Sequence, residues 1–202
     1  MIVPGRYGVR PVDAAGSEYR RPQALACFIE VHVRKDRGGP IRYWSTDSKS
    51  NGRIAATEPL SYFGSLITDF WLELVDGEVV DSGAGSGGGV LDRVLATDDG
   101  ARRFGETAMV PQSGAVAAEG LVWNNVLYDE NDGCHIALGQ SYPTCLEGGS
   151  RMSVEERTQA GLNQSTIHAD FVVGSSEVSV YGVTADGTEE PIIANGSWGF
   201  TP

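Results

Sequence analysis

Two short segments of the chain combine imidazole and carboxylate side chains at spacings that suit metal binding or acid–base chemistry. In the first, His168 and Asp170 are two residues apart, so on a strand both would point to the same face. They would form a pair of metal ligands, or a general base and the group that orients it. A hydrogen-bonded surface pair is the plainer interpretation of this segment taken alone.

The second segment, residues 128–135, places three carboxylates and His135 within eight residues. Their mutual repulsion is costly unless something offsets it, and a divalent cation would do so. The alternative is a polar loop cap. Cys134 stands next to His135 and raises the possibility of a thiol nucleophile. Adjacent side chains point apart on a strand, however, and a Cys–His dyad is assembled in space rather than in sequence, so the thiol has little support.

Glu106 lies at the lip of an apolar strand and, alone, would be an ordinary edge carboxylate. Imidazole and carboxylate ligands without clustered thiolates suit zinc, cobalt or manganese. Two such ions a few ångströms apart form a hydrolytic device. Four ligands are few for two ions, so a fifth is expected. The candidate metal ligands are Glu106, His135, His168 and Asp170.

The elements that must position these residues are mostly strands with turns between them. Asp76-Gly77 predicts a hairpin turn, and the pattern Ser153-x-x-Glu156 predicts a helix that begins at Ser153 and ends at Gly161. The glycine-rich stretch 83–89 lacks the residues of a phosphate-binding loop and is expected to be a flexible loop. Together the patterns predict an α+β fold, with a mainly antiparallel sheet, flanking helices and a metal site at strand ends and loops. The expected strands cover 62–75, 79–80, 107–110, 167–173, 177–183 and 191–194, and a further helix covers 90–95.

Residues 1–45 differ in character from the rest, because arginine and lysine are concentrated there and only 24–33 is strand-like. We interpret this part as an atypical, basic, loosely ordered N-terminal arm. The catalytic domain is expected to occupy residues 46–202.

Composition excludes several classes of function. The 202 residues carry a net charge of −12, which repels phosphate backbones and disfavours nucleic acid as a partner. Three cysteines do not make a disulfide framework, and no run of about 18 apolar residues predicts a membrane span. Without an export signal we expect a reducing, cytoplasmic setting, where the glycosylation patterns at Asn163 and Asn195 mean little.

The order and spacing of many motifs resemble the M29 family of metalloaminopeptidases, and the resemblance covers the C-terminal catalytic portion of that family, from Asn51 to Trp198. The matching segments are Asn51-Gly52, Pro59-Leu60-Ser61-Tyr62-Phe63-Gly64, Asp76-Gly77-Glu78-Val79-Val80, Phe104-Gly105-Glu106-Thr107-Ala108-Met109-Val110-Pro111, Leu127-Tyr128-Asp129-Glu130-Asn131, Cys134-His135-Ile136-Ala137-Leu138-Gly139, Tyr142-Pro143, His168-Ala169-Asp170-Phe171 and Asn195-Gly196-Ser197-Trp198.

This resemblance implies a metal-dependent aminopeptidase that removes N-terminal residues from peptides with two divalent ions (zinc, cobalt or manganese) in one site. Glu106 resembles the bridging, catalytic glutamate, and Tyr142 resembles the tyrosine that steadies the tetrahedral intermediate. His135, His168 and Asp170 resemble the other metal ligands. Glu130 and Asn131 are expected to support the ligands from behind, and the resemblance implies a homodimer.

Two features depart from the family's pattern. Its preceding α/β domain is absent, and the stretch 40–45, which corresponds to the segment of its first glutamate ligand, has no carboxylate. We therefore expect a truncated enzyme in which Asp47 or Glu58 would have to take the open ligand position. The alternative is a catalytically impaired remnant that serves as a metal-binding or assembly module. An unrelated serine hydrolase is disfavoured, since no G-x-S-x-G motif occurs.

Overall fold

The computed structural model describes residues 7–12, 29–33, 41–45, 50–146, 148–183 and 188–199, with the first three segments described by their backbone path alone. Among these residues, every pairing of strands is antiparallel. The strands form sheets of nine, three and two strands. The α+β class with a mainly antiparallel sheet is therefore confirmed.

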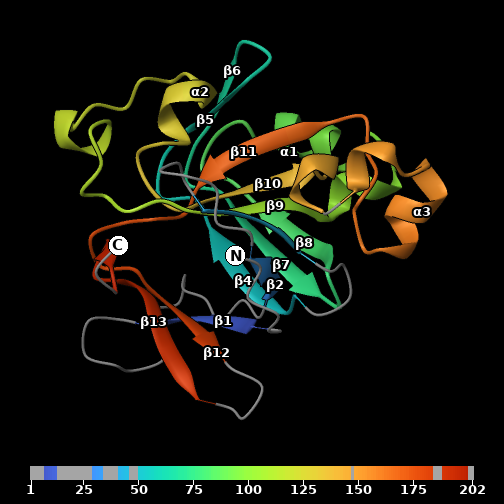
Figure 1. Ribbon diagram of the computed structural model, residues 1–202. Helices are drawn as coiled ribbons and strands as arrows, with labels where there is room; N and C mark the ends of the chain where they lie inside the picture. Colours follow the sequence, from blue (N-terminus) through green and yellow to red (C-terminus); the bar gives the residue numbers. More distant parts are fainter. Residues whose placement is uncertain are drawn as a thin grey trace.

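The nine-stranded sheet runs in the order β11-β10-β9-β3-β2-β1-β12-β13-β14 (Figure 1). It joins the start, middle and end of the chain. Its strands are β1 (Tyr7–Val12), β2 (Ile29–Val33), β3 (Ile41–Ser45), β9 (Phe104–Met109), β10 (His135–Gly139), β11 (His168–Val172), β12 (Ser179–Val183), β13 (Glu189–Ala194) and β14 (Ser197–Trp198).

The N-terminal arm contributes more regular structure than its sequence predicts. Three of its segments form β1, β2 and β3, and β3 pairs with β9, with Tyr43 opposite Thr107. Only the stretch that contains β2 was expected to be a strand. Alternation of apolar residues is weak in the other two, so sequence pattern alone does not identify them.

The two smaller sheets divide the stretch that the sequence predicts as one strand over 62–75. They consist of β4 (Gly52–Ala55), β7 (Trp71–Val75) and β8 (Glu78–Gly83), and of β5 (Leu60–Tyr62) and β6 (Ser65–Ile67). The division arises because Phe63 and Gly64 both have positive φ, 47° and 74°, which is typical of a two-residue hairpin turn. The predicted Asp76-Gly77 turn has the same form and joins β7 to β8.

The helices are short and lie around the sheets. Helix α1 (Gly88–Leu95) begins inside the glycine-rich stretch and buries Leu91, Val94 and Leu95. The capping box at Ser153 is confirmed at the start of α3 (Val154–Gln159), which projects at one edge of the molecule (Figure 1). The remaining helical turns are η1 (Asp99–Arg102), η2 (Ala117–Glu119), α2 (Val126–Asp129), η3 (Pro143–Cys145) and η4 (Gly149–Arg151).

The hydrophobic core holds β10 and β11 in place. Phe70, before β7, packs edge-on against Phe171 of β11 with 5.1 Å between ring centroids. Ile136 and Leu138 of β10 are buried in the same cluster. All six residues of β9 and all five of β10 are buried, so polar side chains on these strands need partners in the interior.

Candidate metal centre

Strand register brings the four predicted ligands to one face of the sheet. Ala137 of β10 lies directly opposite Glu106 of β9 on one side and Asp170 of β11 on the other. His135 and His168 each lie two residues from a member of this row, and residues two apart on a strand share a face. The convergence therefore follows from three adjacent antiparallel strands and their side-chain period of two.

The ligand atoms are close enough to share cations. Glu106 Oε1 lies 3.6 Å from His135 Nε2, and Glu106 Oε2 lies 3.5 Å from His168 Nε2. Asp170 Oδ1 lies 3.3 Å from the same His168 atom. Glu106, His135 and Asp170 offer ligand atoms that all lie within 4.8 Å of one another. The carboxylate of Glu106 thus presents one oxygen to each imidazole.

Burial makes this cluster costly without a further partner. Glu106 is 2% exposed and His135 is 0% exposed. Among the described residues, neither ring nitrogen of His135 has a hydrogen-bond partner, and neither does Nε2 of His168. Buried polar atoms without partners are expensive, and an imidazole lone pair that faces two carboxylates is the arrangement that a divalent cation satisfies. The donor set fits a metal ion.

A backbone carbonyl orients the second imidazole. Nδ1 of His168 lies 2.6 Å from the carbonyl oxygen of Gln140, so Nδ1 carries the proton and donates it to that oxygen. This arrangement directs Nε2 toward Glu106 and Asp170 and is the usual support of a metal-ligating histidine. Burial lowers the pKa of His168, but the carboxylates of Asp170 and Glu106 beside Nε2 and the carbonyl of Gln140 at Nδ1 raise it, and the pKa reaches about 10.

Tyr142 lies against the same imidazole. Its ring centroid is 4.6 Å from that of His168, and the side chain is 42% exposed. The predicted tyrosine is therefore at the edge of the metal centre. Burial and the negative charge of Asp170 raise the pKa of Tyr62, a residue that sequence analysis did not assign to the site.

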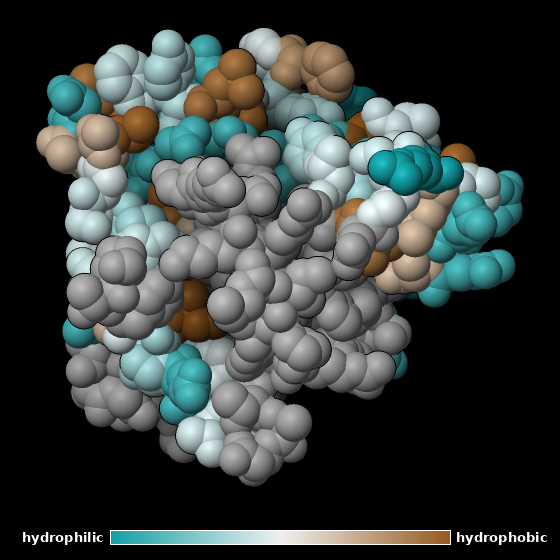
Figure 2. Space-filling view, in the orientation of Figure 1, coloured by the Kyte–Doolittle hydropathy of each residue, from teal (hydrophilic) through white to brown (hydrophobic). Residues whose placement is uncertain are grey.

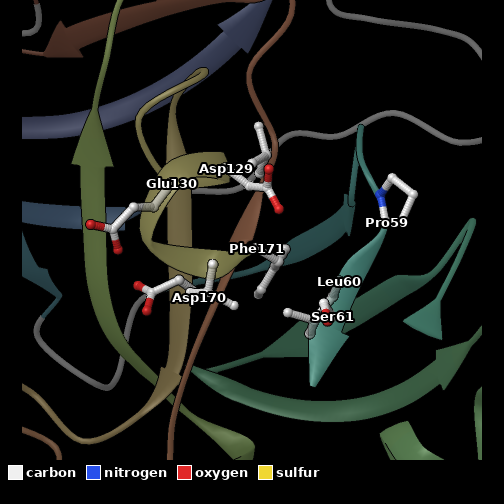
Figure 3. A pocket seen from close by; sticks show the side chains of 9 residues that line it. Pro59, Leu60, Ser61, Asp129, Glu130, Asp170 and Phe171 are labelled. Carbon is white, nitrogen blue, oxygen red and sulfur yellow. The ribbon is translucent and has the colours of Figure 1, made fainter. Parts of the chain in front are cut away.

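The polar residues before β10 make different contacts. The carboxylate of Asp129 accepts hydrogen bonds from the backbone of Trp123 and Asn125, and Asn131 donates to the carbonyl of Leu127. Both hold the turn at α2. Glu130 lines a small pocket together with Ser61 and Asp170 (Figure 3).

The thiol alternative is disfavoured by the surroundings of Cys134. The side chain is 4% exposed, its Sγ faces the carbonyl of Val110 at 3.5 Å, and burial raises the pKa of the thiol to about 11. A nucleophilic cysteine needs a lowered pKa and access to substrate.

Strand β3 lies next to β9, where a carboxylate would stand beside Glu106. None of its residues is acidic. Two residues were expected to replace that ligand. For one of them, Glu58, burial and a hydrogen bond to Asp132 raise the pKa to about 8. Asp47 lies outside the described residues.

Asn163 is a structural residue of the site that sequence analysis missed. It is 5% exposed, and its Nδ2 donates to the carbonyls of Gly100 and Gly139, each at 2.7 Å. Ser141 Oγ accepts from its backbone N–H. This clamp ties η1, which precedes β9, to the end of β10 and to the segment before β11. Its only sequence signal, a glycosylation pattern, carries no information about this role.

Comparisons with known proteins agree with this geometry. The family described as thermophilic metalloprotease (M29) matches residues 43–198. Aminopeptidase 2 of Geobacillus stearothermophilus is 47% identical over 150 residues, which are 74% of this chain and 36% of that protein. Aminopeptidase T of Thermus aquaticus is 44% identical over 147 residues, or 73% and 36%. The chain thus spans about a third of the length of these relatives.

A solved structure supports the fold. Wild-type AmpT from Thermus thermophilus superposes with a TM-score of 0.80 at 30% identity, over 96% of this chain and 50% of that one. In the described part of the chain, none of the helices is both long and apolar enough to cross a bilayer.

Proposed function

Because the chain belongs to the M29 family of thermophilic metalloproteases, we propose that it is the catalytic portion of a metal-dependent aminopeptidase that removes N-terminal residues from peptides. The observation that carries this proposal is the position of Glu106, which presents one carboxylate oxygen to each of two buried imidazoles. A carboxylate placed in this way suits a bridge between two cations.

The residues divide into two ligand groups around that bridge. His135 and Glu106 Oε1 would hold one ion. His168, Asp170 and Glu106 Oε2 would hold the other. Imidazole and carboxylate ligands suit zinc, cobalt or manganese. When bound, such ions supply Lewis acidity, which acidifies water and polarises a peptide carbonyl.

The chain's own side chains would move the proton and steady the developing charge. Glu106 is within reach to accept a proton from attacking water and return it to the leaving amine. The phenol of Tyr142, beside His168, would donate a hydrogen bond to the carbonyl oxygen as it becomes negative. Peptides are the expected substrates, and a cytoplasmic setting and a homodimer remain part of this proposal.

A second function is favoured by one observation, the lack of a carboxylate on β3 beside β9. With the ligand set incomplete, the chain would bind one ion or bind weakly. It would then serve as a metal-binding or assembly module without turnover.

Metal analysis combined with an aminoacyl-arylamide assay separates the two functions. The enzyme hypothesis predicts two equivalents of zinc, cobalt or manganese per chain and release of the arylamine. Glu106→Gln should abolish both, whereas Glu119→Gln, which removes the same charge from the exposed end of η2, should change neither. One equivalent or less without turnover would favour the module.

A further inference from the structure

The pairing of β10 with β11 becomes irregular just beyond the end of β10, beside His168. The backbone N–H of Gln140 donates to the carbonyl of Ile167 at 2.7 Å, and two residues opposed in this way in an antiparallel ladder normally exchange two hydrogen bonds. Here the N–H of Ile167 donates instead to Oγ of Ser165 at 3.2 Å. The carbonyl of Gln140 is therefore released from the ladder and accepts from Nδ1 of His168 at 2.6 Å.

The last residue of β10 makes this departure possible. Gly139 has a φ of 95°, a backbone conformation that glycine adopts readily and other residues rarely do. A Cβ at this position would clash with the carbonyl oxygen of Ile167. Glycine therefore lets the chain turn out of β10 and bring the next carbonyl to the imidazole.

The side chain of Gln140 holds this turn in place. Its Nε2 donates to the carbonyl of Ser141 at 2.7 Å, and its Oε1 accepts from the backbone N–H of Ser165 at 2.9 Å. The half-buried amide thus uses both of its ends on backbone groups. These bonds fasten the peptide group whose oxygen faces His168 to the segment that leads into β11.

We infer that Gln140 is a positioning residue of the metal centre. Its amide fixes the direction of its own carbonyl, and that carbonyl holds the His168 imidazole with Nε2 toward Glu106 and Asp170. Either nitrogen of a histidine can bind a cation, and the hydrogen bond made by the other nitrogen decides which one does. This inference rests on the cation site of the proposed function and adds to it a residue that is not a ligand.

Nitrogen-15 NMR of the imidazole rings in the zinc-loaded chain tests this role without turnover. In the parent chain, Nδ1–H of His168 should give a proton signal protected from exchange with water, and zinc should shift the Nε2 resonance. The signals are assigned by their loss in His168→Gln. Gln140→Met keeps the length of the side chain but makes neither hydrogen bond. Its Nδ1 proton should exchange about 10-fold faster, as expected for the loss of one net hydrogen bond, and zinc should bind about 10- to 100-fold more weakly.

Gln164 provides the matched control. It is a half-buried amide in the same loop, and its Nε2 donates to the carbonyls of Leu162 and Asn163. Gln164→Met should leave the His168 signals and the zinc affinity unchanged. Where Gln140→Met does not fold, Gln140→Ala compared with Gln164→Ala makes the same test.

Two further readouts separate positioning from a general loss of structure. Gln140→Glu keeps an oxygen that can accept from the Ser165 N–H, so it should recover most of the protection that Gln140→Met loses. The imidazole signals of His135, which lies at the other end of β10, should be the same in all these variants.

Several results would overturn the inference. They are unchanged His168 signals in Gln140→Met, an equal change in Gln164→Met, a change at His135 as large as that at His168, and zinc coordination through Nδ1 in the parent chain. Each of these would leave the proposed function standing. A parent chain in which zinc does not shift the His168 signals would overturn the proposed function as well.

Discussion

At the scale of single residues, the metal centre depends on a small side chain at its middle. Ala137 is 0% exposed and lies in register between Glu106 and Asp170. Its methyl group leaves the space that a cation needs. A larger side chain at this position would fill that space.

We therefore expect Ala137→Val to lower zinc affinity by about 10- to 100-fold, the range for replacing residues that surround metal ligands. The matched control is Ala169→Val, which adds the same volume on β11. Ala169 lies between His168 and Asp170 in the sequence, so its side chain points to the opposite face of the sheet. Both variants should lose about 1–3 kcal/mol of stability from overpacking. Zinc titration and thermal unfolding measure the two effects, and equal zinc affinity in both variants would contradict this placement.

His168 gives a prediction about pH. Its pKa of about 10 in the metal-free chain lies above the ordinary 6.5, so the protonated form stabilises the fold below about pH 6.5 and this contribution is lost as pH rises toward 10. An imidazolium has no lone pair for a cation. Cation binding at pH 7 must therefore release this proton.

Zinc titrations at pH 7 in buffers of different ionisation enthalpy would measure that release. We expect His168 to release about one proton per chain when the ion that it would hold binds, and zinc affinity to increase between pH 6.5 and 8.5. His168→Gln should remove this proton and weaken binding. Binding at pH 7 with no proton release would show that His168 is not a ligand.

At the scale of elements, two loop contacts hold the ligand strands together. Asn163 joins η1, the turn before β9, to the end of β10 through the carbonyls of Gly100 and Gly139. Asn163→Ala should reduce the unfolding free energy by about 1–3 kcal/mol, because it removes two buried hydrogen bonds, to the carbonyls of Gly100 and Gly139. Gln164→Ala, which removes a half-buried amide one residue along, should cost less. Urea unfolding compares them, and equal losses would argue against the clamp.

The second contact joins the β4–β5 connection to the loop before β10. The pKa of Glu58 is raised to about 8 by burial, by its hydrogen bond to Asp132, and by the charges of Asp132 and Asp129. The folded chain keeps a proton that the unfolded chain releases above the ordinary value of 4.5. Stability should therefore fall between about pH 4.5 and pH 8 and then level off.

Glu58→Gln keeps the size of the side chain without its titration. We expect this variant to exceed the parent in stability at pH 8.5 by about 1 kcal/mol, allowing for solvent screening of a partly exposed group, and not at pH 5. Glu119→Gln should follow the parent at both pH values. A parallel pH dependence in Glu58→Gln and the parent would exclude the shared proton.

Sequence and structure agree best where a pattern is local. The Asp76-Gly77 hairpin and the Ser153 capping box follow from turn and cap chemistry within a few residues. The four candidate ligands could be predicted because a two-residue period and a family resemblance pointed to them. Ala137 and Asn163 could not be found in this way, since their roles depend on which strands are neighbours. Phe63-Gly64 was missed because a bulky residue rarely adopts positive φ.

At the scale of the whole molecule, the sheet positions the candidate metal centre and the surface carries a net negative charge. The nine-stranded sheet places the metal centre at the end formed by β9, β10 and β11 and continues to β14 at the other. The net charge of −12 attracts cations and repels nucleic acids. The visible face is mixed, with hydrophobic patches among hydrophilic residues (Figure 2). In α2, Leu127 is 73% and Tyr128 53% exposed.

The central claim is that Glu106 stands between two cations held by His135 on one side and by His168 and Asp170 on the other. Anomalous diffraction from crystals of the zinc-loaded chain tests it most directly. The account predicts two anomalous peaks, each within coordination distance of one Glu106 oxygen. A single peak remote from Glu106, or zinc bound only at other side chains, would contradict it.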